Sequence, residues 1–346
     1  MTVSNVLTEV STMKAAVLIK QGEIVVHERE VPSPRRDEVL VQVAAVGVCG
    51  SDVHYFDHGR IGTHVVTGSL ILGHELSGVI VAVGSSVNSD RVGQRVAVEP
   101  QRPCRVCAQC KEGHYNLCPR MEFFATPPID GALCEYVTIQ SDFAHAIPDN
   151  VSDEAAALIE PLSVGIWACK RAQVGVGSRV LIAGAGPIGL ILAQTARACG
   201  ASEIFVTDIS AERREMALTL GATRVLDPLA DSLEGLNVDA FIDASGAPSA
   251  VRSGILAVRP AGRVVLVGLG NESMELPVSI IQDRELWLTG VFRYVNTWPT
   301  AIDLVASGKI DLDALVTGRF GLADTEAALN AGKIPGQMKA IIFPGR

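Results

Sequence analysis

The stretch Arg179-Val-Leu-Ile-Ala-Gly-Ala-Gly-Pro-Ile-Gly189 decides the fold, because an apolar run leads directly into three spaced glycines. We expect a strand before the glycines and a helix over Pro187–Cys199, since proline suits the first turn of a helix. Gly184 allows the tight turn, and Gly186 lets a pyrophosphate approach the backbone. Gly189 lets helix and strand pack closely. The stretch predicts a dinucleotide site; the alternative is a glycine-rich turn without a ligand.

Strands and helices continue to alternate after this turn. A second strand is expected over Glu203–Thr207 and a second helix over Ala211–Leu220, which Gly221 closes. Further short apolar runs follow at Val225–Leu226, Ala240–Ile242 and Val264–Val267. Continuous apolar strands that alternate with helices are typical of a parallel sheet covered on both faces. The fold class predicted for this part is therefore α/β, a doubly wound Rossmann sheet.

An acidic residue follows the second strand of this sheet. Asp208 stands where a carboxylate accepts hydrogen bonds from an adenosine ribose and repels a 2′-phosphate. The sequence therefore favours NAD over NADP. Arg213, five residues further on, tempers this preference, and it is otherwise read as a solvated charge on a helix.

The preceding part of the chain has a different pattern. Short β-type runs at Lys14–Ile19, Val39–Val46, Ser77–Val83 and Arg95–Val98 are separated by glycine and proline. They predict an antiparallel, barrel-like, mainly β segment. Residues 1–12 are patternless, and we expect a frayed extension. A helix is expected over Ser152–Lys170, with Ser152 as its N-cap.

Composition excludes several classes of protein. The 346 residues are 48% apolar and 19% charged, which is wrong for a disordered chain. The net charge of −9 argues against a nucleic-acid partner and against binding to an anionic membrane. No apolar run approaches a membrane span. The first residues lack the features of a signal peptide, so we expect a cytoplasmic protein.

Four of the eight cysteines lie within fifteen residues. The pattern Cys104-x2-Cys107-x2-Cys110-x7-Cys118 lets four thiolates close a tetrahedral zinc shell with no open position, which is typical of a structural site. An iron–sulfur cluster, a redox disulfide and unrelated thiols are the alternatives. A cysteine followed by proline ends one common iron–sulfur motif. Pro119 does follow Cys118, but the interval before Cys118 is too long for that motif, which weakens the iron–sulfur interpretation.

A second set of metal-binding residue types is spread more widely. Cys49 ends an apolar strand, His74-Glu75 begins another, and Glu160 lies on the later helical stretch. Three protein ligands and a water make an open, catalytic zinc site. By spacing alone, Cys49 is as well explained as a buried core thiol and His74 as a hydrogen-bonded core histidine.

Several motifs together resemble the zinc-containing medium-chain dehydrogenases, over residues 13–346. Within them the chain is most similar to the sorbitol/xylitol, or polyol, dehydrogenase branch. The branch rests on Glu160, because the alcohol dehydrogenases of the family carry a cysteine at that place. The motifs are Gly47-Val-Cys49-Gly-Ser51-Asp-Val-His54-Tyr55, Leu72-Gly-His74-Glu75, Tyr115-Asn-Leu-Cys118-Pro, Phe124-Ala-Thr-Pro-Pro128, Glu160-Pro-Leu162 and Gly290-Val-Phe-Arg293-Tyr294.

The resemblance implies the roles of individual residues. The catalytic zinc would be held by Cys49, His74 and Glu75, with Glu160 as a ligand or as holder of the zinc-bound water. The proton would leave through Glu160 and the zinc-bound water, or through Ser51 and His54, of which His54 is otherwise explained as a structural surface histidine. The polyol would contact Tyr55, Glu160, Arg293 and Tyr294. NAD would contact Gly184, Gly186, Pro187, Ile188, Gly189, Asp208, Arg213, Val267, Gly268, Leu269, Val291, Phe292 and Arg293.

The activity implied is NAD-dependent oxidation of a polyol such as xylitol or sorbitol at C2 to the ketose, and the reverse, by zinc-assisted hydride transfer. The alternatives are a zinc-dependent dehydrogenase of the butanediol or threonine type, and a non-catalytic NAD-binding protein. The architecture implied is a GroES-like catalytic domain of residues 1–162 and 293–346, with a structural-zinc lobe over 99–120. A Rossmann domain of residues 163–292 is inserted in it. A homotetramer with one catalytic and one structural zinc in each chain is also implied.

Overall fold

The computed structural model describes residues 11–270 and 273–346, which form two compact units. The first unit runs to Glu160 and resumes at Leu312, and the second spans Pro161–Asp311. Residues 293–311 therefore make their contacts within the second unit, and the domain boundaries expected at 162 and 293 stay a prediction. In the described parts of the chain, none of the helices combines the length and apolar character that a membrane span needs.

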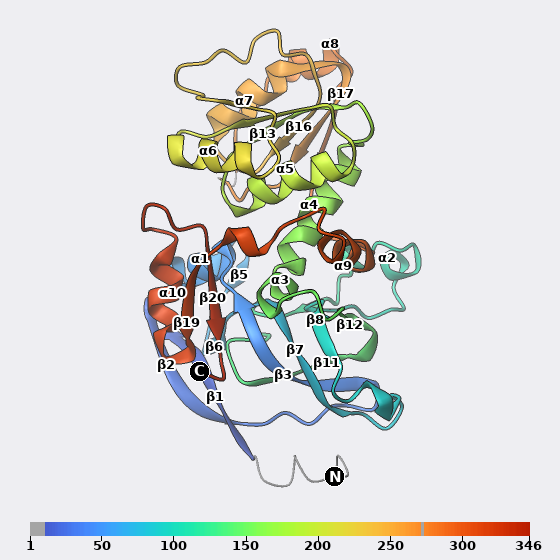
Figure 1. The fold of residues 1–346 in the computed structure, drawn as a ribbon, viewed down its shortest axis with the longest axis vertical. Coiled ribbons are helices and arrows are strands. Elements are labelled where there is room, and N and C mark those ends of the chain that lie inside the picture. Colours follow the sequence, from blue (N-terminus) through green and yellow to red (C-terminus); the bar gives the residue numbers. More distant parts are fainter. Residues whose placement is uncertain (1–10, 271–272) are drawn as a thin grey trace. The chain divides into compact units, whose positions relative to one another are not determined.

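The first unit is built on a seven-stranded sheet with the order β12-β8-β7-β3-β20-β19, in which β11 also pairs with β3 (Figure 1). Strand β3 is antiparallel to β7, and β7 is antiparallel to β8, as expected for this part of the chain. The strands of this unit are β1 (Thr12–Lys20), β2 (Glu23–Glu30), β3 (Glu38–Gly47), β4 (Arg60–Ile61), β5 (His64–Val65), β6 (Leu70–Ile71), β7 (Glu75–Val83), β8 (Arg95–Val98), β9 (Gln101–Arg102), β10 (Glu122–Phe123), β11 (Tyr136–Gln140), β12 (Ala144–Ala146), β19 (Val316–Gly321) and β20 (Lys339–Phe343).

Short helices and turns connect these strands. The α-helices that belong to this unit or begin in it are α1 (Gly50–His58), α2 (Ala108–Lys111), α3 (Asp153–Ala157), α4 (Ile159–Arg171) and α10 (Thr325–Ala331). The 3-10 helices are η2 (Ser89–Arg91), η3 (Tyr115–Leu117), η4 (Ser141–Phe143), η5 (Asp313–Leu315) and η6 (Leu322–Asp324).

Two expectations for this part of the chain need correction. The helix expected over Ser152–Lys170 is two helices, α3 and α4, that part at Leu158. Pro161 explains the break, because it has no N–H to donate to the carbonyl four residues back and its ring crowds that carbonyl. Ser152 does cap α3, since its hydroxyl accepts a 2.9 Å bond from the N–H of Ala155.

The second correction concerns the start of the chain. Thr12 already belongs to β1 and pairs with Glu30 of β2, so the frayed extension expected over residues 1–12 is wrong at that position. Paired backbone in an antiparallel ladder is held by its hydrogen bonds, whatever the polarity of its side chains. Ser11 is also held, since its carbonyl accepts a 3.1 Å bond from the N–H of Val31, and residues 1–10 of the expected extension lie outside the described residues.

The second unit contains a six-stranded sheet with the order β15-β14-β13-β16-β17-β18, whose neighbouring strands are all parallel (Figure 1). This is the doubly wound order, which reverses direction beside the first strand, β13. Its strands are β13 (Arg179–Ala183), β14 (Glu203–Thr207), β15 (Arg224–Leu226), β16 (Val238–Asp243), β17 (Val258–Leu266) and β18 (Trp287–Gly290). Its helices, besides α4, are α5 (Pro187–Ala198), α6 (Ala211–Thr219), α7 (Pro248–Ala257), α8 (Val278–Asp283) and α9 (Trp298–Ala306).

Both faces of this parallel sheet are buried. Val180 and Ile182 point to one face and Leu181 to the other, and all three are 0% exposed. A strand that is covered on both sides needs apolar residues at consecutive positions, which explains the uninterrupted apolar runs in the sequence. The predicted Rossmann sheet is thereby confirmed.

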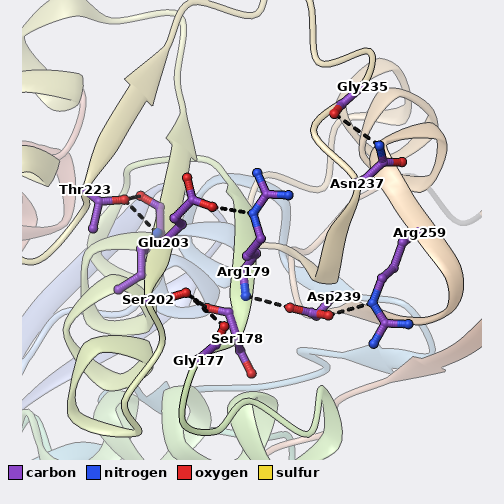
Figure 2. A network of polar contacts seen from close by, with 11 residues as sticks. Gly177, Ser178, Arg179, Ser202, Glu203, Thr223, Gly235, Asn237, Asp239 and Arg259 are labelled. Carbon is purple, nitrogen blue, oxygen red and sulfur yellow. Dashed lines mark hydrogen bonds and ion pairs between the residues drawn. The ribbon is translucent and has the colours of Figure 1, made fainter.

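A polar network joins the amino ends of four of these strands, β13, β14, β16 and β17 (Figure 2). Asp239 on β16 accepts a 2.7 Å bond from the backbone N–H of Arg179 on β13 and a 2.6 Å bond from the guanidinium of Arg259. The Arg179 side chain in turn pairs with Glu203 on β14. Burial opposes ionisation of Asp239, but the two donors outweigh it and lower the pKa of the carboxyl. The network therefore ties the strand ends opposite to the glycine turn.

We expect Asp239→Asn to lower the stability of the protein at neutral pH by about 1 kcal/mol, since it weakens two hydrogen bonds to a charged group. The folded pKa of Asp239 lies below its ordinary value of 3.8, so the ionised carboxylate stabilises the fold above that pH and stops doing so as pH falls through the folded pKa. The difference in thermal midpoint between variant and wild type should therefore be constant from about pH 8 to pH 5 and shrink below about pH 4. Asp283→Asn, at an exposed carboxylate of the same unit, is the control, and equal midpoints for Asp239→Asn and wild type at pH 7 would contradict the network's role.

Candidate active site and metal centres

Three residues of metal-binding types meet in the first unit. The ligand atoms of Cys49, His74 and Glu75 all lie within 4.8 Å of one another. Cys49 precedes helix α1 as its N-cap, and Glu75 begins β7. The antiparallel register of β3 and β7 places Gly47 opposite Glu75, so the residue two positions after Gly47 reaches the start of the partner strand. Sheet pairing therefore assembles this group from two separate motifs.

Asp52, in the first turn of α1, fixes both motifs. Its carboxylate accepts a 3.0 Å bond from the N–H of Cys49 and a 2.9 Å bond from the N–H of Gly73. The same carboxylate lies 3.5 Å from Nδ1 of His74. Burial disfavours the charged carboxylate, but His74 and the two N–H groups lower the pKa of Asp52 below its usual value. A histidine held by a carboxylate at Nδ1 has its Nε2 available for a metal, which is the usual orientation in zinc sites.

The carboxylate of Glu75 is only half satisfied by the protein. Its Oε1 accepts a 2.6 Å bond from Lys339, which also donates a 2.8 Å bond to the carbonyl of Val48. Its Oε2 is buried and has no hydrogen-bond partner among the described residues. This oxygen lies against Gly47, where any Cβ would overlap it. A buried carboxylate oxygen without a donor is costly, and a cation at this point would satisfy it.

The electrostatics of the group also favour a cation. Burial lowers the pKa of Lys339, but Glu75, Cys49 and Glu160 outweigh burial and raise it. The pKa of His74 follows the same pattern, since burial lowers it while Asp52 and Cys49 raise it well above the usual value. A buried place that stabilises positive charge on two different side chains is strongly negative. One thiolate, one imidazole and one carboxylate therefore fit Zn²⁺ both in donor type and in charge.

The remaining residues predicted for this centre lie on two helices. Glu160 is 4% exposed in the first turn of α4 and acts electrostatically on Lys339, but it is not one of the three residues that form the close group. On α1, Tyr55 is 4% exposed and Ser51 is half-buried. His54 is exposed, with its ring 4.6 Å from that of His58. Of these four residues, Glu160 and Tyr55 are buried, Ser51 is half-buried and His54 is exposed.

The four spaced cysteines also come together. The sulfur atoms of Cys104, Cys107, Cys110 and Cys118 lie within 4.8 Å of one another. Cys107 precedes α2 and Cys118 follows η3, so two short helices position them. The backbone N–H of Val106 is the main cause that lowers the pKa of Cys104 to about 6, whereas burial raises the pKa of Cys110 to about 12. Four sulfurs around one point cannot all ionise unless a cation is present, and this donor set suits a tetrahedral zinc.

The glycine turn of the second unit has the geometry that the sequence predicts. Gly184 adopts φ +96°, which side chains disfavour. A Cβ at Gly189 would overlap the carbonyl oxygen of Gly184, so glycine is required for the close approach of helix α5 to the turn. A Cβ at Gly186 would meet nothing within 4 Å, so the space beside this residue is open. Pro187 occupies the first turn of α5, whose N-terminus offers free N–H groups to a phosphate.

A cavity of about 970 Å³ adjoins this turn, lined in part by Gly184, Gly186, Asp208 and Arg213. The carboxylate of Asp208 accepts 2.8 Å bonds from the N–H groups of Ala185 and Ser210, so the turn itself fixes its position. The cavity is of the size that holds a nucleotide.

The other residues predicted to contact NAD follow two further strands. Val267, Gly268 and Leu269 come directly after β17, and Val291, Phe292 and Arg293 come directly after β18. They do not line the cavity beside Asp208 but stand at the same carboxyl edge of the sheet, and so does Ile188 in the first turn of α5. Arg293 adopts φ +55°, and its guanidinium lies 4.7 Å from the ring centre of Phe292. Tyr294 is 0% exposed and packs edge-on against Trp298.

Sequence reasoning missed two residues of the metal-binding group. Asp52 stood inside a quoted motif, and its place three residues after Cys49 in a helix start was the signal of a capping carboxylate. Lys339 gave no signal, because it lies 264 positions from Glu75 along the chain. It reaches the group because β20 pairs with β3, with Ile341 opposite Gly47.

Comparison with known proteins agrees with this arrangement. Residues 35–149 match the model of the alcohol dehydrogenase GroES-like domain, and residues 187–307 match that of the zinc-binding dehydrogenases. A sorbitol dehydrogenase of Bacillus subtilis (strain 168) is 44% identical over 346 residues, which cover 96% of this chain and 98% of the relative.

Two solved structures share the fold and contain a cofactor. A zinc-binding dehydrogenase from Sinorhizobium meliloti 1021 bound to NADP has a TM-score of 0.90 and 31% identity, over 97% of this chain and 100% of its own. A short chain alcohol dehydrogenase from Escherichia coli CFT073 complexed with NADH has a TM-score of 0.90 and 31% identity, over 96% and 100% of the two chains.

The half-satisfied carboxylate beside a thiol and an imidazole, the four-sulfur group and the glycine turn thus lie in a chain that is similar to a sorbitol dehydrogenase along nearly its whole length. This protein belongs to the zinc-binding, medium-chain dehydrogenase family.

Proposed function

We propose that this protein oxidises a polyol such as sorbitol or xylitol at C2 to the ketose, with NAD as hydride acceptor, and catalyses the reverse reaction. The observation that carries the proposal is the group of Cys49, His74 and Glu75, with its buried and unsatisfied carboxylate oxygen. The choice of substrate is supported by the 44% identity to a sorbitol dehydrogenase. We also propose a preference for xylitol or L-iditol, which a comparison of polyol substrates tests.

Two groups of residues would hold the two zinc ions of the proposed enzyme. Cys49, His74 and Glu75 hold the catalytic zinc, which when bound is a Lewis acid that favours loss of a proton from an alcohol beside it. Asp52 keeps the imidazole of His74 in position, and Lys339 holds Oε1 of Glu75. The four cysteines of the lobe hold the structural zinc.

Movement of the substrate proton falls to residues near the start of α1 and α4. Glu160 is buried and is proposed as a further ligand or as the holder of a water at the metal. Ser51 and His54, on the first two turns of α1, form a path of increasing exposure, from a half-buried hydroxyl to an exposed imidazole. A neutral imidazole accepts a proton readily near physiological pH, which suits this role.

Polyol recognition is proposed for Tyr55, Glu160, Arg293 and Tyr294. Each offers a donor or acceptor for a hydroxyl, and three of the four are almost fully buried. NAD is proposed to bind along the carboxyl edge of the parallel sheet, with its adenosine ribose at Asp208 and its pyrophosphate at the glycine turn. A homotetramer is proposed from the family resemblance. Strand β18, at one edge of the six-stranded sheet and with Trp287 65% exposed, offers a surface for such assembly.

We expect two zinc ions in each wild-type chain, one for each group of ligands. Cys110→Ser should retain one, because three sulfurs no longer close the tetrahedral shell. His74→Ala should also retain one and should leave the lobe intact. Cys134→Ser, at a buried cysteine outside both groups, is the matched control and should retain two. Elemental analysis of the dialysed proteins measures this, and a full complement in His74→Ala would remove that residue from the site.

We expect NAD reduction to be faster with C5 and C6 polyols than with ethanol by a factor on the order of 10⁴ in kcat/KM, because a site built to bond several hydroxyls rejects an alcohol that lacks them. The panel should include xylitol, sorbitol, 2,3-butanediol and threonine. Comparable efficiency with ethanol or butanediol would exclude the polyol assignment. Absence of turnover with every alcohol, in protein that contains both zinc ions, would favour a non-catalytic role.

We expect Asp208→Asn to reduce the preference for NAD over NADP by about ten- to a hundredfold in kcat/KM, since a charge that repels the 2′-phosphate is lost. Asp231→Asn removes a charge from the lining of the same cavity and should leave the ratio nearly unchanged. Steady-state kinetics with both cofactors measures the ratio. Equal shifts in the two variants would mean that net charge, and not the position of Asp208, sets the preference.

A further inference from the structure

Helices α4 and α5 of the second unit pack closely where α4 has a glycine. A Cβ at Gly165 would lie 2.7 Å from Cγ2 of Ile191 and 3.3 Å from Oγ1 of Thr195. Thr195 is itself fully buried and donates a 2.7 Å bond to the carbonyl of Ile191. The contact therefore brings the two backbones near each other without a side chain on α4 between them.

The segments that follow the two helices are also joined. The N–H of Gly177 donates a 2.9 Å bond to the carbonyl of Gly200, and the N–H of Ser202 donates a 2.8 Å bond to the carbonyl of Ser178. The Ser202 hydroxyl also donates a 2.8 Å bond to the carbonyl of Gly177, as Figure 2 shows. The carboxyl ends of α4 and α5 are thus fixed side by side, so the helices run in the same direction.

One helical turn beyond the glycine contact, each helix carries a cysteine. Cys169 follows Gly165 by four positions, and Cys199 follows Thr195 by four, so both lie on the faces that meet. Each of the two thiols acts on the ionisation of the other, so their side chains lie near each other. Cys169 is 1% exposed, whereas Cys199, which caps the end of α5, is exposed. A buried and an accessible thiol therefore face each other.

The exposed thiol of Cys199 is more acidic than the buried thiol of Cys169. Stepwise oxidation requires this difference, because the accessible sulfur has to react first. The hydrogen bond from Cys169 is the main cause that lowers the pKa of Cys199 to about 7, with help from Lys170 and against burial. The same hydrogen bond, together with burial, raises the pKa of Cys169 well above its usual value. Near neutral pH a substantial fraction of the exposed sulfur is therefore thiolate, which is the nucleophilic form.

We propose that Cys169 and Cys199 are a redox modification site, which a hydroperoxide converts reversibly into a disulfide between α4 and α5. The Cys199 thiolate attacks the outer peroxide oxygen, which breaks the O–O bond, forms a sulfenic acid and releases water or an alcohol. The Cys169 thiol then displaces the hydroxyl from that sulfur as water. In total the two thiols lose two electrons and two protons, and the hydroperoxide takes up the two electrons and the two protons.

The other cysteines do not form such a pair. Five of them belong to the two metal-binding groups. Cys134 is buried, and burial raises its pKa to about 12, so it is neither accessible nor ionised. The pair also lies wholly within the second unit, so its oxidation does not require the metal-binding groups to react.

The test is peptide mass spectrometry of the zinc-loaded protein after treatment with a small excess of hydrogen peroxide. Digestion at lysine, arginine and glutamate separates Cys169 from Cys134 by cleavage after Glu154, and isolates Cys199 between Arg197 and Glu203. We expect a crosslinked pair of these two peptides, lighter than their sum by two hydrogen atoms, which disappears after treatment with a dithiol reductant. Failure to find it while Cys199 is oxidised to the sulfinic acid would overturn the proposal.

Three variants separate the steps. Cys199→Ser should prevent oxidation of Cys169, and Cys134→Ser should give the crosslink as in wild type. Cys169→Ala should let a sulfenic acid persist on Cys199, where dimedone traps it, and should slow alkylation of Cys199 at pH 7 by roughly tenfold, since the hydrogen bond that favours the thiolate is lost. Oxidation of Cys169 at an unchanged rate in Cys199→Ser, or unaltered alkylation of Cys199 in Cys169→Ala, would contradict the assignment of roles.

Discussion

Buried negative charge is the constraint on which the first unit depends. A thiol and carboxylates gather where β3, β7 and α1 begin or end, and Glu75 keeps one oxygen without a donor among the described residues. Lys339 donates a hydrogen bond to that carboxylate, and this bond satisfies Oε1 but not Oε2. Such an arrangement is stable as a binding site for a cation and costly as an empty core. A metal bound there would therefore be part of the fold's electrostatic balance as well as of its chemistry.

The second unit depends on two places where the backbone of one segment approaches another closely, and both places need glycine. Gly189 admits the carbonyl of Gly184 at the start of α5, and Gly165 admits Ile191 and Thr195 further along the same helix. The first contact places the helix N-terminus beside the cavity that Asp208 lines. The second brings Cys169 and Cys199 together. Helix α5 thus begins at the turn expected to bind phosphate and ends at the pair of thiols. The first arrangement depends on glycine at position 189 and the second on glycine at position 165.

The cysteines show how environment decides chemistry for one residue type. In the lobe, four sulfurs share one point, and backbone N–H groups and burial move the pKa values of Cys104 and Cys110 in opposite directions. Cys134 is isolated and buried. Between α4 and α5, the interaction of the two thiols and their different exposure lower the pKa of Cys199 and raise that of Cys169. The same side chain is a ligand, a packing residue or a nucleophile according to its neighbours.

The sequence alone determined the features that depend on short spacing. The glycine turn, the lobe's four cysteines and the strand–helix alternation of the second unit were all readable, because the residues concerned act within one turn, loop or strand. The single helix expected over Ser152–Lys170 is wrong, because Pro161 interrupts the preceding turn, and Lys339 gave no local signal. Only the tertiary structure placed Lys339 beside Glu75 and Cys169 beside Cys199, because both contacts depend on which strands pair and which helices pack. Such long-range choices are set by the whole chain's packing and not by any local pattern.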